Sequence, residues 1–88
     1  MKEIEHGYCV CKDGHLLLKE TPIDGQAHSI DIPIKCTRGR PHALVHTHPS
    51  GNINPSRQDL ETGKKTNLPI CVIVRVNGRG RVRCYKAV

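Results

Sequence analysis

The segment Ile70–Val76 (ICVIVRV) constrains the fold more than any other stretch of this 88-residue chain. A short and nearly continuous apolar run of this kind predicts a central strand that is covered on both faces. The chain contains no Phe and no Trp, so its core must be built from Ile, Leu, Val, Cys and Ala. We expect residues 1–88 to form one domain. A bound metal ion would help to stabilise such a small core.

Turn signals rich in Gly, Pro, Asn and Asp divide the rest of the chain into short elements. The apolar patterns between them predict strands at 8–12, 15–20, 28–34, 43–48, 70–76 and 81–85. Residues 56–65 are predicted to form the main helix, because Pro55 precedes them and Ser56 can cap them. The predicted fold class is therefore α+β: a mostly antiparallel mixed sheet of about six strands with one main helix.

Two of these strands alternate between apolar and polar residues. In His28–Ile34 the alternation predicts a half-buried strand, and Pro33 places it at an edge or at a strand end. In Arg81–Tyr85, which follows the hairpin signal Asn77-Gly78, Val82 and Cys84 share one face. Arg81, Arg83 and Tyr85 share the other face. This pattern predicts an edge strand with a basic outer face.

The charge balance favours acidic partners or simply solubility. Lys and Arg number 14 against 8 Asp and Glu, which gives a net charge of +6. Nucleic acid, an anionic protein surface and a membrane face are the partner classes that such a charge attracts. Base stacking needs aromatic faces, and only Tyr8 and Tyr85 are available, so nucleic acid is not favoured. No segment approaches the ~20 apolar residues of a membrane span, so no membrane partner is expected.

Five cysteines cannot all pair within one chain. Cys71 and Cys84 lie in apolar, strand-like runs, where cysteine often serves as a small buried hydrophobe. The N-terminus has no apolar stretch of signal-peptide type. A reducing, cytoplasmic compartment is therefore the simplest setting. Cys9 and Cys11 could face one metal ion, but paired zinc-binding cysteines are usually spaced by two to four residues, so a structural zinc there is a minor alternative.

Residues 46–59 (HTHPSGNINPSRQD) have the residue types and spacing of a metal site. On a strand, His46 and His48 point to the same face, and Pro49 ends the strand near them. On the helix that follows, Ser56 and Asp59 share a face because they are three residues apart. Two imidazoles and one carboxylate are three ligands for Zn²⁺. They leave a fourth position open for water, as catalytic zinc sites do.

Each half of this stretch also has a purely structural interpretation. Two histidines spaced in this way are often polar residues at the rim of a strand. Ser56-x-x-Asp59 resembles the capping box that begins many helices. The combination of both halves, with prolines placed to end the strand and to start the helix, favours the metal site.

The pattern His-x-His-Pro, six residues, then Ser-x-x-Asp resembles the signature of the JAMM metalloproteases (the JAB/MPN+ domain), which are zinc-dependent peptidases and isopeptidases. It is written here as His46-Thr47-His48-Pro49 and Ser56-Arg57-Gln58-Asp59. The sequence HPSG…PSRQDLET is also similar to the JAMM-type segment of bacterial RadC proteins. The motif spans 14 residues, and a weaker similarity in the order of the strands covers most of the chain. The resemblance implies a JAB/MPN-like fold with a deaminase-like core.

The resemblance also implies roles for these residues. His46, His48 and Asp59 would hold the zinc ion, and Ser56 would support the oxyanion of a tetrahedral intermediate. A glutamate upstream, at the start of a strand, would be the general base that takes a proton from water and passes it to the leaving amine. Glu5 fits best because it stands directly before His6-Gly7 and a predicted strand. Glu20 and then Glu3 are the alternatives, whereas Glu61 should point elsewhere.

The function that the resemblance implies is zinc-dependent cleavage of a peptide or isopeptide bond. The substrates would be protein conjugates, of the ubiquitin-like or sulfur-carrier type. A homodimer could supply additional cover for the sheet of so short a chain. Two other functions stay open. The first is a non-catalytic metal-binding interaction module, and the second is a RadC-like protein associated with nucleic acid.

Overall fold

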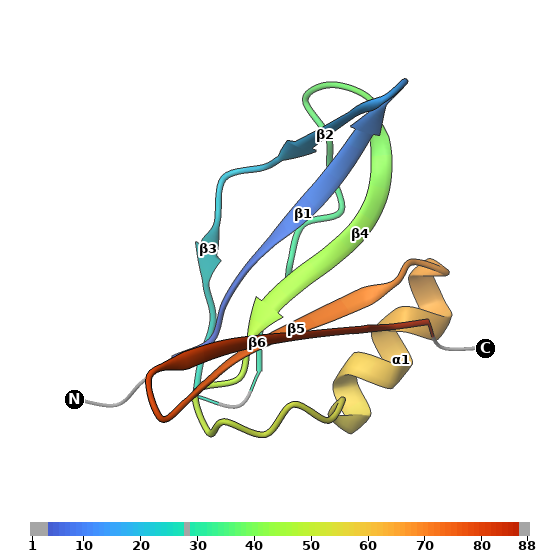
Figure 1. Cartoon of the computed structure of the whole chain (residues 1–88). Helices are drawn as coiled ribbons and strands as arrows, with labels where there is room; N and C mark the ends of the chain where they lie inside the picture. The colour runs from blue at the N-terminus through green and yellow to red at the C-terminus, as the bar shows by residue number, and fades with distance from the viewer. Residues whose placement is uncertain (1–3, 28, 87–88) are drawn as a thin grey trace.

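The computed structural model describes residues 4–27 and 29–86. Within them the chain forms one helix, α1 (Arg57–Thr66), and a sheet of six strands. The strands are β1 (His6–Asp13), β2 (Leu16–Lys19), β3 (Ile23–Asp24), β4 (Arg40–Thr47), β5 (Ile70–Val76) and β6 (Arg79–Tyr85). Their order is β2-β1-β4-β5-β6, with β3 paired to β1. Figure 1 shows that the sheet curls and that α1 lies to one side of it.

The pairing of the strands confirms the predicted fold class. Every pair of neighbouring strands is antiparallel except β4 with β5. A parallel pair needs a crossover connection, and α1 lies within the segment that joins β4 to β5. β5 lies between β4 and β6, and β6 forms an edge, as predicted. At the turn between β5 and β6, Asn77 (φ 51°) and Gly78 (φ 77°) adopt the positive φ angles that a two-residue hairpin turn requires.

The core is built from small aliphatic residues and cysteines, as the composition predicts. Its buried centre is formed by Cys9, Cys11, Leu44 and Ile70. Tyr85 shares a face with Arg81 and Arg83, as predicted, because their partners are alternate residues of β5. Tyr85 packs against the buried centre, however, so its predicted outward position is wrong. Val82, in contrast, is 63% exposed.

The prediction of a strand at 28–34 is wrong for residues 29–34, which the structure describes. His28 lies outside the described residues, and Ser29–Cys36 forms no strand. Pro33 lacks the N–H group that a strand ladder uses. The alternation indicates only part of the inward set: Ile30 and Ile32 are half-buried and line a pocket that α1 also lines, whereas Ile34 is 42% exposed and Asp31 lines the same pocket. The segment therefore covers the sheet without pairing to it.

Four of the five cysteines are paired in this structure. Disulfides join Cys11 to Cys36 and Cys71 to Cys84, and Cys9 is a buried free thiol. The interpretation of Cys71 and Cys84 as unpaired hydrophobes is therefore wrong here. These two residues are direct cross-strand partners in β5 and β6, a register that the sequence does not reveal.

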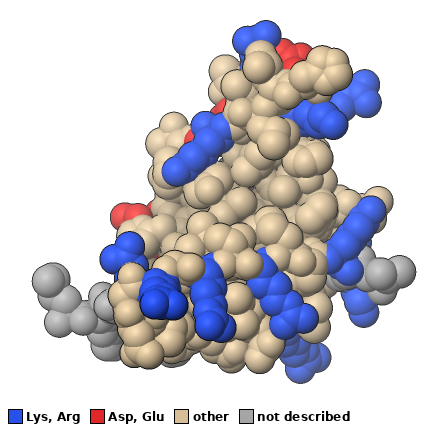
Figure 2. Space-filling model, viewed as in Figure 1, with Lys and Arg blue, Asp and Glu red and all other residues tan. Residues whose placement is uncertain are grey.

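The basic edge predicted from the sequence is confirmed. Figure 2 shows Lys and Arg side chains gathered along the lower part of the molecule, where β5 and β6 lie in Figure 1. Arg79, Arg81 and Arg83 of β6 are all exposed. Among the described residues, no helix has both the length and the apolar character needed to cross a membrane.

Candidate metal centre

The end of β4 brings two imidazoles together. His46 lies in β4 and His48 follows its last residue. The backbone N–H of His48 donates to the Ile73 carbonyl (3.0 Å), so the pairing with β5 continues past the end of the strand. The side chains of His46 and His48 are 3% and 9% exposed, and their ring centroids are 4.7 Å apart. The prediction that they share a face is therefore confirmed.

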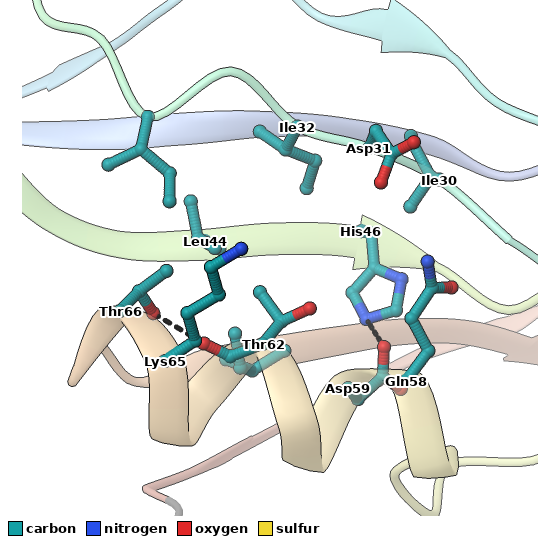
Figure 3. A pocket seen from close by; sticks show the side chains of 12 residues that line it. Ile30, Asp31, Ile32, Leu44, His46, Gln58, Asp59, Thr62, Lys65 and Thr66 are labelled. Atoms are coloured by element: carbon teal, nitrogen blue, oxygen red, sulfur yellow. Dashed lines mark hydrogen bonds and ion pairs between the residues drawn. The ribbon is translucent and has the colours of Figure 1, made fainter.

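Asp59 joins the two histidines from the first turn of α1. Its Oδ1 lies 3.0 Å from His46 Nε2, and its Oδ2 lies 3.1 Å from His48 Nε2. Figure 3 shows the contact with His46 across the space between β4 and α1. Ligand atoms ~2.0–2.1 Å from a tetrahedral zinc ion are roughly 3.3 Å from one another. The two contacts of Asp59 match this spacing. The residues of this site whose donor atoms all lie within 4.8 Å of one another are Glu5, His46 and His48, and Asp59 lies beside this group.

Contacts on the far side of each ring set the orientation of the two imidazoles. His48 Nδ1 donates to the Asn52 carbonyl oxygen (2.8 Å), since that oxygen can only accept. In the neutral ring, Nε2 then carries the lone pair that binds a metal. His46 Nδ1 lies 2.9 Å from Glu5 Oε1, and its Nε2 is buried with no well-aligned hydrogen bond among the described residues. The donor set that faces Asp59 therefore fits a cation.

The electrostatics of the centre favour positive charge between these side chains. Burial alone would raise the pKa of Asp59, but the close contact with His46 and the hydrogen bonds with Ser56 outweigh it and lower the pKa to about 2. Burial alone would lower the pKa of His46, but Asp59 and Glu5 raise it. The two carboxylates therefore stabilise a proton on His46. A metal ion bound between these side chains would supply the same positive charge.

Ser56 and Asp59 form a capping box at the start of α1. Asp59 N–H donates to Ser56 Oγ (3.1 Å), and Ser56 N–H donates to Asp59 Oδ2 (2.8 Å). The structural interpretation of this pair is therefore correct, and the carboxylate that caps the helix also lies against both histidines. The cap positions Asp59, and the Ser56 hydroxyl proton remains available to another acceptor.

Glu5 is the predicted glutamate that the structure brings to the centre. It is 5% exposed and precedes β1. Its backbone is held by Gln26 and Gly25 through hydrogen bonds of 2.9 and 2.7 Å. One donor atom each from Glu5, His46 and His48 lie within 4.8 Å of one another.

The other glutamates lie elsewhere or outside the described residues. Glu20 accepts hydrogen bonds from Thr37 and lines a different pocket. Glu61 is exposed and pairs with Arg57 on the outer side of α1. Glu3 lies outside the described residues.

Gly7 positions His46, although the sequence analysis did not single it out. A Cβ atom at Gly7 would lie 2.7 Å from Ile32 Cδ1, 2.9 Å from the Val45 carbonyl oxygen and 3.1 Å from His46 Cβ. A side chain here would push β1 away from the residues that carry His46. A single glycine within a strand pattern often marks such a close approach, and that signal could have found it.

We expect Gly7→Val to lower the free energy of unfolding by about 1–3 kcal/mol, because the added atoms overpack a site partly walled by backbone. Denaturant unfolding of the metal-free protein measures this change. Gly80→Val in β6 is the matched control, since a Cβ atom at Gly80 meets nothing within 4 Å. Equal stability of the two variants would contradict the packing argument.

The candidate metal centre lies between two pockets. One, of about 250 Å³, touches His46 and Asp59 and continues between α1 and the segment that contains Ile30 and Ile32 (Figure 3). The other, of about 190 Å³, touches Glu5, His48 and Ser56. A molecule in this second pocket would therefore meet a histidine, a carboxylate and a hydroxyl together.

A model of the family described as prokaryotic homologs of the JAB domain matches residues 22–87. The matched region contains His46, His48, Ser56 and Asp59, whereas Glu5 precedes it. Searches of the curated proteins and of the solved structures found no match to the chain. Since the family match spans most of the sequence and includes the histidines and the carboxylate that converge in the structure, this chain belongs to the family of prokaryotic homologs of the JAB domain.

Proposed function

We propose that this chain is a zinc-dependent hydrolase that cleaves a peptide or isopeptide bond. One observation carries the proposal. The Asp59 carboxylate lies 3.0 Å from His46 Nε2 and 3.1 Å from His48 Nε2, and Glu5 and Ser56 line one pocket with His48. Family membership alone supports a hydrolase or a metal-binding role. The finer assignment rests on what these five side chains can do together.

The donor set favours zinc over the other common divalent cations. Two imidazole nitrogens and one carboxylate are the ligands of several catalytic zinc sites. Magnesium and calcium prefer sites made entirely of oxygen atoms. A bound zinc ion supplies Lewis acidity, which lowers the pKa of a water molecule and polarises a carbonyl group.

Glu5 is the residue that we assign to proton transfer. The contact with His46 uses Oε1, which leaves Oε2 as the oxygen that can accept a proton from water. Glu5 lines the same pocket as Ser56, so a peptide carbonyl held there lies within reach of both side chains. The protonated carboxyl group then donates to the departing amine, which completes general acid–base catalysis.

Ser56 is assigned to the oxyanion. Its Oγ already accepts from Asp59 N–H, so its own proton is directed to a different acceptor. We expect Ser56→Ala to lower kcat about 10²–10³-fold, as the loss of one oxyanion donor does. It should also cost ~1 kcal/mol of stability through the lost cap.

Ser29→Ala is the matched control for that variant, because Ser29 lines neither of the two pockets beside the candidate metal centre. Steady-state kinetics and thermal unfolding of both variants separate the two effects. A Ser56→Ala protein that unfolds earlier but keeps full kcat would show that Ser56 serves the helix alone.

We propose that the substrate is a protein chain with an extended C-terminal segment, in conjugates of the ubiquitin-like or sulfur-carrier type. The test is a panel of such proteins with fluorogenic amides at the C-terminus, assayed with zinc-loaded and metal-stripped protein. Cleavage that depends on zinc supports the proposal. Zinc-loaded, folded protein that cleaves no member of the panel would favour a non-catalytic metal-binding module.

The basic edge favours a second candidate, an association with nucleic acid. Arg83 Nη1 donates to Asn54 Oδ1 (3.2 Å), which links the exposed arginines of β6 to the loop of the metal centre. Fluorescence anisotropy with duplex and single-stranded DNA at stepped salt concentrations tests it. Tight binding with a steep salt dependence supports this function. Our primary proposal predicts binding that disappears at physiological salt.

A further inference from the structure

Three cysteines form a second cluster of potential metal ligands in the core. The sulfur atoms of Cys9, Cys11 and Cys36 lie within 4.8 Å of one another. Cys9 and Cys11 come from β1, and Cys36 comes from the segment that covers the sheet. Cys9 and Cys11 are 1% and 0% exposed, so the cluster is closed to solvent on the side of the strand. The metal centre around His46 uses none of these residues.

We propose that Cys9, Cys11 and Cys36 form a structural zinc site when the Cys11–Cys36 disulfide is reduced. Two sulfur atoms joined by a disulfide cannot both bind a metal, so the bond and the metal site are alternative states of the same residues. Three thiolates supply three of the four ligands of a structural zinc site. Soft thiolate ligands also favour zinc over magnesium and calcium.

Glu20 is the carboxylate that we assign as the fourth ligand, because it lines one pocket with Cys9 and Cys36, although it lies outside the three-cysteine group. Its backbone N–H donates to the Cys9 carbonyl oxygen (3.0 Å), and its carboxylate accepts from the hydroxyl of Thr37 (3.1 Å), the residue after Cys36. Glu20, Cys9 and Cys36 all line one pocket of about 260 Å³.

Reduction of the Cys11–Cys36 disulfide requires two electrons, which a phosphine can supply. A phosphine supplies two electrons to the disulfide and is oxidised to the phosphine oxide, whose oxygen comes from water. The two protons of that water are transferred to the sulfur atoms of Cys11 and Cys36, which become thiols. The three thiols then lose their protons when zinc binds. No oxidant is needed for the metal-bound state.

The three-cysteine cluster ties β1 to the wall of the pocket next to His46 and Asp59. Cys36 ends the segment whose Ile30, Asp31 and Ile32 line the pocket next to His46 and Asp59. In either state of the cluster, Cys36 holds this segment against β1. A zinc ion would preserve the pocket wall in a reducing compartment, where the disulfide opens.

The test uses full-length His48→Ala protein, in which the centre around His46 lacks a ligand. Cobalt(II) is added after anaerobic reduction with a phosphine. We expect about one cobalt per chain, with the near-ultraviolet thiolate-to-cobalt charge-transfer band of a tetrahedral thiolate site. Air-oxidised protein should show no band. Circular dichroism confirms that each variant is folded.

Serine substitutions complete the experiment. Cys9→Ser and Cys36→Ser, each in the His48→Ala background, should lose at least half of the band intensity. Cys84→Ser is the matched control, because Cys84 lies outside the cluster, and it should retain the band. Absence of cobalt uptake by the folded, reduced protein would overturn the proposal, as would an unchanged band in Cys9→Ser. Neither result bears on the histidine site, which is assayed separately.

Discussion

Glu5→Gln is expected to retain zinc and to lower kcat/KM by about 10²–10⁴-fold, the usual contribution of a general base. The amide oxygen of Gln can still accept from His46 Nδ1, so the orientation of that ring is preserved in the variant. What is lost is a group that takes a proton from water and returns it to the leaving amine. Loss of an outer-sphere charge can weaken metal binding about 10–100-fold, so the assay is run at saturating zinc.

Glu20→Gln is the matched control for Glu5→Gln. The same change of charge is made at a glutamate whose carboxylate contacts Thr37 and lines a different pocket. With the Cys11–Cys36 disulfide intact, its kcat/KM should equal that of the wild type. A fully active Glu5→Gln protein would show that the proton is carried by another group, and the assignment of Glu5 as the base would then be wrong.

Asp59→Asn is expected to weaken zinc binding by more than about 100-fold, the upper end of the effect of changing a residue that does not itself bind the metal. Hydrolysis should be lost together with the zinc ion. Asparagine can still accept from Ser56 N–H and cap α1, so the helix start should survive. The negative charge between the two Nε2 atoms disappears, however, and one oxygen becomes an NH₂ group that cannot bind a metal. Competition with a chromophoric chelator measures the zinc affinity.

Glu61→Gln provides the comparison for Asp59→Asn. It removes the same charge from the same helix, two residues further on, at a side chain that is 68% exposed and pairs with Arg57. Such an exposed pair is worth only ~0.3–0.5 kcal/mol, so fold and zinc affinity should stay close to those of the wild type. Equal affinities in the two variants would mean that Asp59 serves the helix alone.

The sequence predicted which side chains of residues 46–59 lie together, because they belong to one short segment. The spacing of His46 and His48 on a strand, and of Ser56 and Asp59 on a helix, fixes which side chains share a face. Capping and metal binding seemed to be competing interpretations. In the structure, one carboxylate makes the cap and faces both histidines, because the first turn of α1 lies directly against the end of β4.

Contacts between distant segments were harder to predict. Glu5 was preferred over Glu20 only through the resemblance, and its 2.9 Å contact with His46 spans 41 residues of sequence. The pairing of Cys71 with Cys84 depends on the register of β5 and β6, and that of Cys11 with Cys36 depends on the path of the covering segment. Local patterns do not encode either of these features.

The segment 29–36 shows how a partly correct pattern can suggest the wrong backbone. Its alternating isoleucines indicate part of the set of side chains that turn inward, and Ile32 does pack against the core. Whether a segment with one apolar side pairs as a strand or lies over a sheet depends on whether a free edge is within reach. Here the edges next to β1 are taken by β2 and β3. The segment crosses the face of the sheet instead.

Metal content is the measurement that tests the central claim most directly. Protein without a His tag, with its disulfides intact, is dialysed at neutral pH and analysed by inductively coupled plasma mass spectrometry. We predict about one zinc per chain in the wild type and in Glu61→Gln, and almost none in His48→Ala and Asp59→Asn. Folded wild-type protein that holds no zinc after zinc is added back would contradict the account, as would zinc retained in His48→Ala.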